Sequence, residues 1–452
     1  MTQNSSAQKT SKRFSPAGPL SGKITVPGDK SISHRALILS SLAIGKSRIT
    51  GLLEGEDVLA TAAAMRAMGA KIEKSGDTWT VNGVGTGGLT QAREAIEMGN
   101  SGTSTRLLMG LVASHDITTT FTGDASLTAR PMGRVIDPLS EMGADIQARS
   151  SGEGKSCLPL TLRGLCPAVP IEYRLPMASA QVKSAILLAG LNIPGITKVI
   201  EPVPTRDHSE TMLRGFGAEL TVETDAEGVR TIALTGEAEL KPQNIKVPGD
   251  PSSAAFPVVA ALLVPGSDIV VKNVGINPTR AGLFEVLQKM GADLGFLRKR
   301  TVGGEPIADI RVRHSKLTGI EVPADIAPCM IDEFPVLFVA AALAEGTTTT
   351  CGLQELRVKE SDRLSQMAQG LASLGVEVTE QPDGLTIIGK SGKPLAGGRN
   401  KPAIETALDH RIAMSFAVAG LVTKGGLALD DITPAQTSFP GFAEMLKGLA
   451  KA

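Results

Sequence analysis

The chain has 452 residues, 42% hydrophobic and 20% charged, so it is long enough for two or more domains and too apolar to be disordered. Its 46 Lys and Arg residues balance 46 Asp and Glu residues, and aromatic residues make up only 3%. A chain without a net positive field and with few aromatic rings to stack on bases is a poor candidate for a nucleic-acid-binding protein.

Residues 1–15 contain no hydrophobic stretch, which disfavours a secretory signal and predicts a frayed tail, with a fragment of a transit peptide as the alternative. The longest apolar runs, such as residues 334–344, fall short of the roughly 20 residues that cross a bilayer. The four cysteines form no CxxC pair, a usage typical of a reducing cytosol. We therefore expect a cytoplasmic protein.

A helix-like phrase that ends in glycine recurs along the chain, first as AAMRAMGAKI at residues 63–72. Each copy predicts an amphipathic helix that a glycine terminates and a strand follows, and a frayed sixth copy closes the chain. Such a regular recurrence indicates internal repeats. The glycines of the five clear copies are Gly69, Gly143, Gly217, Gly291 and Gly375.

A second phrase alternates with the first: a polar, Ser-rich loop, an apolar helix, a glycine and a β-rich run. Its six copies begin near residues 28, 99, 178, 249, 331 and 408. Two helices and several strands per repeat predict an α/β architecture, with the second-phrase helices buried and the first-phrase helices outside. Six repeats favour two domains of three. A continuous solenoid is the alternative, which the buried helices disfavour.

Each polar loop stands at a helix N-terminus, where free backbone N–H groups and the helix dipole favour anions. Taken singly, most of the charged loop residues would be solvated surface, and His34 is expected to be structural. Together they predict a cationic pocket for small anionic substrates in a neutral protein. The cations concerned are Lys30, Arg35, Arg106, Arg130, Arg206, Lys359, Arg363 and Arg411.

Two carboxylates, Asp332 and Glu333, interrupt the apolar stretch from Cys329 to Ala344. We expect them to be desolvated, with a raised pKa that suits a general base. Glu360 lies among the charges of RVKESDR at residues 357–363. No Walker A loop, GxSxG elbow or His/Cys cluster with metal-ligand spacing is present, so neither metal nor cofactor is expected.

At these residues the sequence resembles the 5-enolpyruvylshikimate-3-phosphate synthases over almost its whole length. The matching motifs occur in the family's order: GDKSISHR, GNSGTSTR, LTARPMGR, SAQVK, IDEFP, RVKESDR and LDHRIAMS. The motifs GDKS, SAQVK, RDHSE and NPTR (residues 277–280) resemble those of the family's class II branch.

The resemblance implies the enolpyruvyl transferase fold, a two-domain inside-out α/β barrel of six βαβαββ repeats. Residues 29–247 would form an N-terminal domain of three repeats. Residues 1–28 and 248–452 would form a C-terminal domain of three repeats, with the active site in the cleft between the domains. Closure of the domains around substrate would complete this site.

The resemblance also implies a reaction on the pathway to chorismate and aromatic amino acids. The enolpyruvyl group of phosphoenolpyruvate passes to the 5-hydroxyl of shikimate 3-phosphate through a tetrahedral intermediate, and phosphate leaves. Asp332 would take the hydroxyl proton, Glu360 or Lys30 would protonate the methylene carbon, and Asp57 would be a supporting carboxylate. The implied contacts to shikimate 3-phosphate are Lys30, Ser31, Arg35, Ser179, Ala180, Gln181, Arg206, Asp332 and Lys359. Those to phosphoenolpyruvate are Lys30, Gly102, Arg130, Gln181, Arg363 and Arg411.

The sequence departs from the family pattern at Thr437, where some members carry a Lys that contacts phosphoenolpyruvate. The alternatives are the sister enzyme that acts on a UDP-sugar, which has a Cys where this chain has Ala125, and a non-catalytic repeat scaffold. We expect a monomer. We also expect intermediate sensitivity to glyphosate, because Gly102 lacks the methyl group of tolerant members while Leu107 replaces the Pro of many sensitive ones.

Overall fold

The computed structural model describes residues 10–151 and 154–450. The chain forms two compact units, each with a hydrophobic core of its own. The N-terminal unit comprises Gly28–Pro248 and Thr301–Glu305. The C-terminal unit comprises the residues up to Pro27, Gly249–Arg300 and the residues from Pro306 onward.

The N-terminal unit contains three successive repeats, each with two helices and three strands of a sheet. The first repeat consists of α1 (Lys30–Leu42), β3 (Ile44–Thr50), α2 (Glu56–Ala67), β4 (Lys71–Ser75) and β5 (Thr78–Val84). The second consists of α3 (Gly102–Ala113), β7 (Thr118–Thr122), α4 (Gly133–Glu141), β8 (Asp145–Ser150) and β9 (Ser156–Arg163). The third consists of α5 (Ala180–Gly190), β11 (Ile196–Glu201), α6 (His208–Gly215), β12 (Leu220–Thr224) and β13 (Arg230–Thr235).

The three sheets of this unit share one pairing pattern, which identifies the repeats as copies. In the first, β5 lies between β3 and β4 and pairs antiparallel with both. The same holds for β9 between β7 and β8 and for β13 between β11 and β12. A short parallel strand completes each sheet. These are β14 (Asn244–Lys246), β6 (Ile96–Glu97) and β10 (Glu172–Arg174).

The C-terminal unit repeats the plan less regularly. Its first repeat is α7 (Pro251–Leu263), β15 (Asp268–Gly275), α8 (Gly282–Lys289), β16 (Asp293–Val302) and β17 (Glu305–Arg313), with β2 (Ser21–Thr25) as the parallel strand. Its second is α9 (Ala327–Met330), α10 (Phe334–Leu343), β18 (Thr347–Thr349), α11 (Arg363–Ser373), β19 (Glu377–Gln381) and β20 (Gly384–Ile388). Its third is β21 (Leu395–Ala396), α12 (His410–Gly420), β22 (Thr423–Lys424), β23 (Leu427–Leu429) and α13 (Phe442–Leu449).

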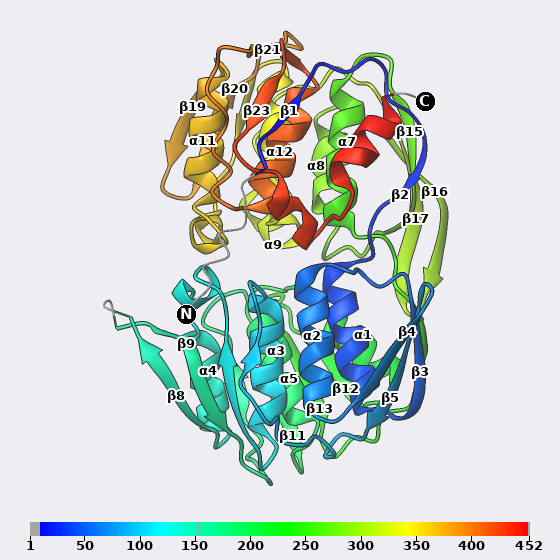
Figure 1. Cartoon of the computed structure of the whole chain (residues 1–452), viewed down its shortest axis with the longest axis vertical. Coiled ribbons are helices and arrows are strands. Elements are labelled where there is room, and N and C mark those ends of the chain that lie inside the picture. The colour runs from blue at the N-terminus through cyan, green and yellow to red at the C-terminus, as the bar shows by residue number, and fades with distance from the viewer. Residues whose placement is uncertain (1–9, 152–153, 451–452) are drawn as a thin grey trace. The chain divides into compact units, whose positions relative to one another are not determined.

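Short 3-10 helices lie in loops of the described residues: η1 (Leu127–Ala129), η2 (Ala324–Ile326), η3 (Gln354–Val358) and η4 (Thr433–Thr437). Within each unit, helices lie side by side with strands at their flanks, as α1, α2 and α3 do beside β3 to β5 (Figure 1). The α/β architecture built from repeats is therefore confirmed.

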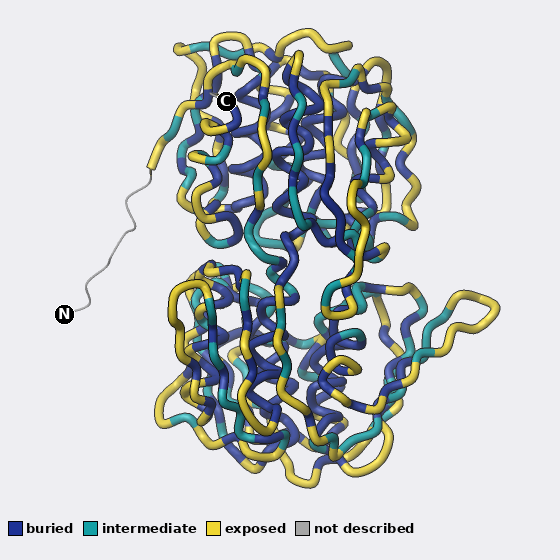
Figure 2. The backbone as a smooth tube through the Cα atoms, turned by 90° about the vertical axis from the view of Figure 1, so that its right-hand side faces the viewer, coloured by how far each residue is buried: buried dark blue, intermediate teal, exposed yellow. Residues whose placement is uncertain are grey.

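The prediction of six buried helices is also confirmed. The helices α1, α3, α5, α7, α10 and α12 are buried along nearly their whole length, while α2, α4, α6, α8, α11 and α13 keep an exposed face. Figure 2 shows buried backbone inside each unit and exposed backbone at its periphery. The predicted glycines terminate five of the outer helices with φ between 77° and 106°, a left-handed conformation that glycine adopts without a steric cost.

Five of the six inner helices begin at a side-chain N-cap, which satisfies a backbone N–H of the first turn. The capping residues are Asp29, Ser101, Ser179, Asp250 and Asp409. The sixth helix, α10, has Glu333 at this position without a side-chain cap. The caps fix the polar loops at the N-terminal ends of apolar helices.

A frayed tail is predicted over residues 1–15, of which residues 1–9 lie outside the described residues. For residues 10–15 the prediction is wrong. Strand β1 (Lys12–Phe14) pairs antiparallel with β23, with Lys12 opposite Leu429, and so completes the last repeat. Strands β8 and β9 form a hairpin, with Ser150 opposite Ser156, and residues 152 and 153 between them lie outside the described residues.

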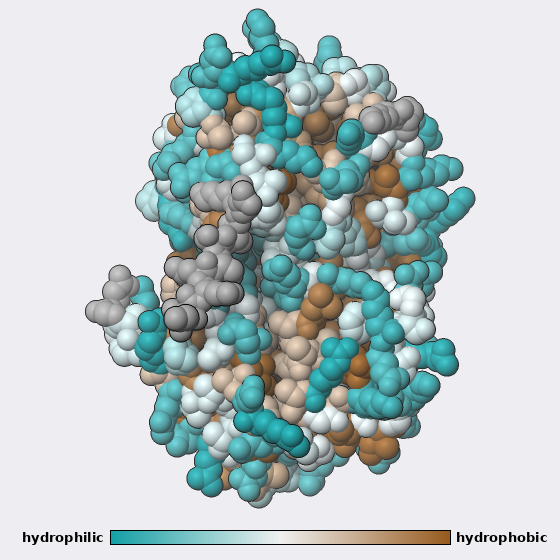
Figure 3. Space-filling view, viewed as in Figure 1, coloured by the Kyte–Doolittle hydropathy of each residue, from teal (hydrophilic) through white to brown (hydrophobic). Residues whose placement is uncertain are grey.

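The described residues include no single helix that is long and apolar enough to cross a membrane; one bent pair, residues 324–330 with 334–343, passes the test of length and composition. Figure 3 shows hydrophilic side chains over most of the face in view, with hydrophobic residues in small groups between them.

Candidate active site

The inner helices of the N-terminal unit, α1, α3 and α5, are joined to one another near their N-terminal ends by polar side chains. Three contacts close this ring: His34 Nδ1 to Ser104 Oγ at 3.3 Å, Arg106 Nη1 to Gln181 Oε1 at 2.8 Å, and Arg35 Nη2 to Ser184 Oγ at 2.7 Å. The predicted residues of this unit lie at this end of the helices or in adjoining loops, and we call them the N-terminal cluster. They are Lys30, Ser31, Arg35, Gly102, Arg130, Ser179, Ala180, Gln181 and Arg206.

Arg35 is buried, and its guanidinium is held by three oxygens. It donates from Nε to Ser209 Oγ (2.8 Å), from Nη2 to Ser184 Oγ and from Nη1 to the carbonyl of Ser31 (2.9 Å). Ser209 lies in the first turn of α6, next to the loop that carries Arg206. These hydroxyl and carbonyl oxygens orient the Arg35 guanidinium between α1, α5 and α6.

Lys30 forms an ion pair with Asp57 of α2. Below the pair, Ser104 donates to the carbonyl of Asp57 at 3.1 Å, and His34 Nδ1 lies 2.8 Å from Thr61 Oγ1. Burial, with a further contribution from nearby Lys30, lowers the pKa of His34 from 6.5 to about 3. His34 is therefore neutral and structural, as expected from the sequence.

Gly102 is the first residue of α3 and faces two guanidinium groups. A Cβ built on it would lie 2.9 Å from Arg106 Nη1 and 3.3 Å from Arg130 Nη1. Arg130 in turn donates to Asn100 Oδ1 at 2.5 Å, and Gln181 Nε2 donates to Thr103 Oγ1 at 3.0 Å. Because Gly102 has no Cβ, both guanidinium groups can lie close to the start of α3, where they and the backbone N–H groups can bind a small anion together.

The inner helices of the C-terminal unit form a second ring. Ser252 of α7 donates from Oγ to Glu333 Oε1 at the start of α10. Arg411 of α12 lies 3.9 Å (Nη1–Oε1) from Glu333 and donates to the carbonyl of Ser252 at 3.4 Å. The Arg411 guanidinium also lies over the ring of Phe256 at 5.8 Å. Arg280, of the NPTR motif, donates to Ser252 Oγ at 2.7 Å and so orients the serine that contacts Glu333.

We call the predicted residues of this unit the C-terminal cluster. They are Asp332, Lys359, Glu360, Arg363 and Arg411, and Arg363 lies in contact with Asp332 and Glu360. Its guanidinium donates to Asp332 Oδ1 (3.2 Å), Glu360 Oε2 (2.5 Å) and Asp409 Oδ2 (2.8 Å). Burial alone would lower the pKa of Arg363, but Asp409, Glu360 and Asp332 outweigh it and raise the pKa above its ordinary value. Lys359 Nζ lies 3.8 Å from Asp332 Oδ1.

The surroundings of Asp332 differ from those expected. The sequence analysis predicted desolvation of both carboxylates by apolar neighbours, but only Glu333 is fully buried. The Asp332 side chain is 17% exposed and faces the cations Arg363 and Lys359. The apolar residues after Glu333 point into the core as α10, while the chain before α10 turns Asp332 toward the charged loop of residues 357–363.

The sequence analysis did not single out Asp409 as a functional residue. Asp409 is completely buried, caps α12 through the backbone N–H of Arg411 (2.8 Å) and pairs with Arg363, so it positions two members of the C-terminal cluster. An Asp directly before an apolar helix is a recognisable N-cap signal.

Thr437, the position at which the sequence departs from the family pattern, lies in η4, and its hydroxyl donates to the carbonyl of Pro434.

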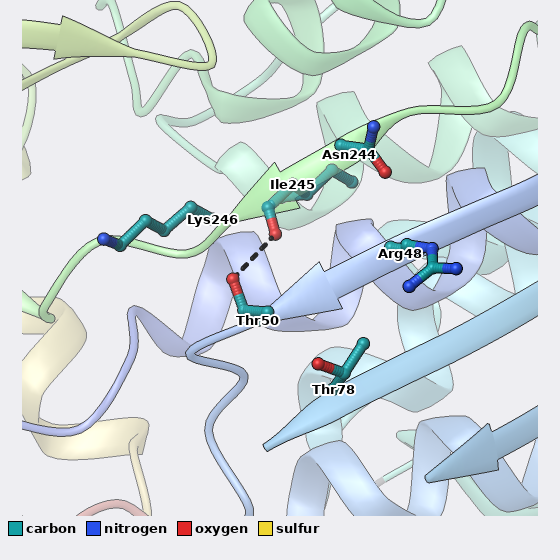
Figure 4. A pocket seen from close by; sticks show the side chains of 6 residues that line it. All are labelled: Arg48, Thr50, Thr78, Asn244, Ile245 and Lys246. Atoms are coloured by element: carbon teal, nitrogen blue, oxygen red, sulfur yellow. Dashed lines mark hydrogen bonds between the residues drawn. The ribbon is translucent and has the colours of Figure 1, made fainter. Parts of the chain in front are cut away.

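A shallow cavity of about 290 Å³ lies elsewhere on the N-terminal unit, at the edge strand β14. Figure 4 shows its lining, in which Thr50 Oγ1 donates to the carbonyl of Ile245 at 3.5 Å beside the cations Arg48 and Lys246. None of the predicted site residues lines it.

In residues 10–151 and 154–450, no group of three or more His, Cys, Asp or Glu side chains could hold a metal ion.

Known proteins resemble this chain over nearly its full length. The profile of the family described as EPSP synthase (3-phosphoshikimate 1-carboxyvinyltransferase) matches residues 14–446. Proteins named 3-phosphoshikimate 1-carboxyvinyltransferase from Sphingopyxis alaskensis and Novosphingobium aromaticivorans are 67% and 65% identical over 441 residues, which is 97% of this chain and 98% and 99% of theirs.

Solved structures agree with these relatives. The EPSP synthase of Acinetobacter baumannii is 48% identical and superimposes with a TM-score of 0.85 over 98% of both chains. An enolpyruvyl transferase from Streptomyces tendae, 19% identical, shares the fold with a TM-score of 0.74 over 97% of this chain and 96% of its own. The two-unit α/β repeat architecture is therefore the enolpyruvyl transferase fold, and the chain belongs to the EPSP synthase family.

Proposed function

We propose that this chain transfers the enolpyruvyl group of phosphoenolpyruvate to the 5-hydroxyl of shikimate 3-phosphate and releases phosphate. The observation that carries the proposal is the cluster around Arg363, in which Asp332, Lys359 and Glu360 lie within one set of charge contacts. The carboxylate of Asp332 can accept a proton, and the neighbouring cations Lys359 and Arg363 can bind a phosphate or a carboxylate group. A reaction that removes a hydroxyl proton while two anionic substrates are bound requires both functions.

In this proposal the N-terminal cluster supplies most of the binding groups for shikimate 3-phosphate, and Lys359 approaches its phosphate. Arg35 and Arg206 offer positive charge, while Ser31, Ser179, Ala180 and Gln181 offer hydrogen bonds at the starts of α1 and α5. The first turns of these helices add backbone N–H groups and favourable dipoles. Phosphoenolpyruvate is held by Lys30, Gly102, Arg130, Gln181, Arg363 and Arg411.

The chemistry is addition followed by elimination. Asp332 accepts the proton of the 5-hydroxyl, whose oxygen attacks C2 of phosphoenolpyruvate, while Glu360 or Lys30 delivers a proton to the methylene carbon. The tetrahedral intermediate then loses a proton from the methyl group and expels phosphate, which restores the double bond. Residues 29–247 and residues 1–28 with 248–452 act as the two domains that close on the substrates. The protein works as a cytoplasmic monomer without a cofactor.

The acceptor substrate gives the test. Purified protein is incubated with phosphoenolpyruvate and either shikimate 3-phosphate or UDP-N-acetylglucosamine, and free phosphate and the enolpyruvyl product are followed by 31P and 1H NMR. The proposal requires stoichiometric phosphate and an enolpyruvyl ether with shikimate 3-phosphate only. Turnover of the UDP-sugar alone, or of neither acceptor, overturns it.

A further inference from the structure

A buried cluster of three charged residues lies within the third repeat of the N-terminal unit. Lys183, in the first turn of α5, places its Nζ 3.0 Å from Glu201 Oε2 and 2.7 Å from Glu210 Oε1. The side chains are 0%, 0% and 1% exposed. We call Lys183, Glu201 and Glu210 the lysine clamp. A buried charge group of this kind contributes little net stability, because desolvation offsets the attraction, so its position suggests another role.

The clamp encloses the loop that carries Arg206. Glu201 is the last residue of β11, and Glu210 lies in the first turn of α6, so the carboxylates bracket residues 202–209. Thr205 is buried and donates from Oγ1 to Glu201 Oε1, which ties the middle of the loop to the same clamp. Both ends and the centre of the loop are therefore fixed to α5.

The helix that carries Lys183 also carries the binding groups at its start. Ser179 caps α5, and Gln181 lies two residues before Lys183. The next residue, Ser184, bonds to Ser209 at 2.7 Å, and both serines accept from Arg35. These buried hydrogen bonds join α1, α5 and the first turn of α6, and Ser184 and Ser209 are the chain neighbours of Lys183 and Glu210.

We infer that Lys183 is a positioning residue for the shikimate 3-phosphate groups of the N-terminal cluster. Through Glu201 and Glu210 it sets the loop of Arg206, and Ser209 with it, at a fixed distance from the start of α5. The ammonium group lies too deep to meet a substrate, so its effect passes through the loop. This inference rests on the proposed function, since it assigns the clamp to one of the two substrates.

The test separates positioning from stability. Single loss of Lys183 would leave two carboxylates buried without their cation and would destabilise the fold, which says little about binding. The informative variant replaces the whole clamp at nearly constant volume: Lys183→Met, Glu201→Met and Glu210→Met. A matched control is Leu234→Ala in β13, which creates a buried cavity in the same unit without touching the polar network.

Shikimate 3-phosphate binding is measured by titration calorimetry without phosphoenolpyruvate, followed by steady-state kinetics. The clamp variant is expected to bind shikimate 3-phosphate about tenfold more weakly, or worse, and to keep its KM for phosphoenolpyruvate within about threefold. The control is expected to lose thermal stability with both constants unchanged. Unchanged shikimate 3-phosphate affinity in a folded clamp variant overturns the inference, as does an equal loss of affinity in the control.

Thr205→Val gives a second, milder test if the clamp variant does not fold. It removes the hydroxyl that ties the loop to Glu201 and keeps the shape of the side chain. We expect a weakened affinity for shikimate 3-phosphate of about threefold or more, with KM for phosphoenolpyruvate unchanged. An affinity equal to that of the parent protein contradicts the inference. Failure of the parent protein to bind shikimate 3-phosphate would instead refute the proposed function.

Discussion

Adding one methyl group at Gly102 tests how the structure places phosphoenolpyruvate. Gly102 is the first residue of α3 and has no positive φ, so Gly102→Ala is compatible with the backbone. The new Cβ would lie 2.9 Å from Arg106 Nη1, closer than real Cβ contacts, and 3.3 Å from Arg130 Nη1. Both atoms are ends of flexible side chains, so the guanidinium groups will move rather than the helix.

The magnitude follows from the hydrogen bond that this movement stretches. Ordinary carbon contacts need about 3.5 Å, so Arg106 Nη1 must shift by roughly 0.5 Å or more. The same nitrogen donates to Gln181 Oε1 at 2.8 Å, a charge-assisted bond. Weakening such a bond costs about 1–1.4 kcal/mol, which corresponds to a five- to tenfold rise in KM for phosphoenolpyruvate. Glyphosate is longer than phosphoenolpyruvate, so its inhibition constant is expected to rise by a larger factor.

The assay compares inhibition constants for glyphosate at matched phosphoenolpyruvate saturation. The control variant is Gly133→Ala, which also substitutes the first residue of a helix but has no atom within 4 Å of the added Cβ. We expect the parent protein to be intermediate in sensitivity, Gly102→Ala to be more tolerant and Gly133→Ala to match the parent. Equal constants for all three proteins would mean that Gly102 does not line the phosphoenolpyruvate site.

Asp332→Asn is expected to lower kcat by about 10²–10⁴ while shikimate 3-phosphate still binds, and near-normal turnover would remove Asp332 from the mechanism. Saturating shikimate 3-phosphate is expected to reduce the radius of gyration in solution scattering, and an unchanged radius would count against domain closure. His34 has a folded pKa of about 3 against 6.5 unfolded, so its contribution to stability is complete above pH 6.5 and is lost as the pH falls toward 3. Urea unfolding should show the stability advantage over His34→Asn shrinking by about 2 kcal/mol between pH 7 and pH 5, and a constant difference would contradict the neutral buried state.

Much of the fold could be predicted because its signals are local and recur. The glycines that end five outer helices need a left-handed backbone, and they stand at the same place in each copy of the phrase. The uniformly apolar helices are buried because they have no polar face to present to water. A polar loop before such a helix marks its N-terminal end, and many of the predicted site residues lie at these ends.

The rest depended on partners far apart in the chain. Strand β1 is polar and short, and only its pairing with β23, more than 400 residues away, makes it part of the fold. Asp332 faces Arg363 and Lys359, which lie about 30 residues further along the chain, so the apolar residues beside it in sequence misled the prediction of its surroundings. The burial of Lys183 could not be predicted from SAQVK, because no neighbouring residue in the sequence indicates that Glu201 and Glu210 enclose it.

Phosphate release in the presence of both substrates tests the central claim most directly. The purified protein is incubated with shikimate 3-phosphate and phosphoenolpyruvate together and with each alone, in buffer that contains a metal chelator. We expect sustained phosphate release only when both substrates are present, at a rate that the chelator does not change. Release from phosphoenolpyruvate alone, or no release from the pair, would contradict it.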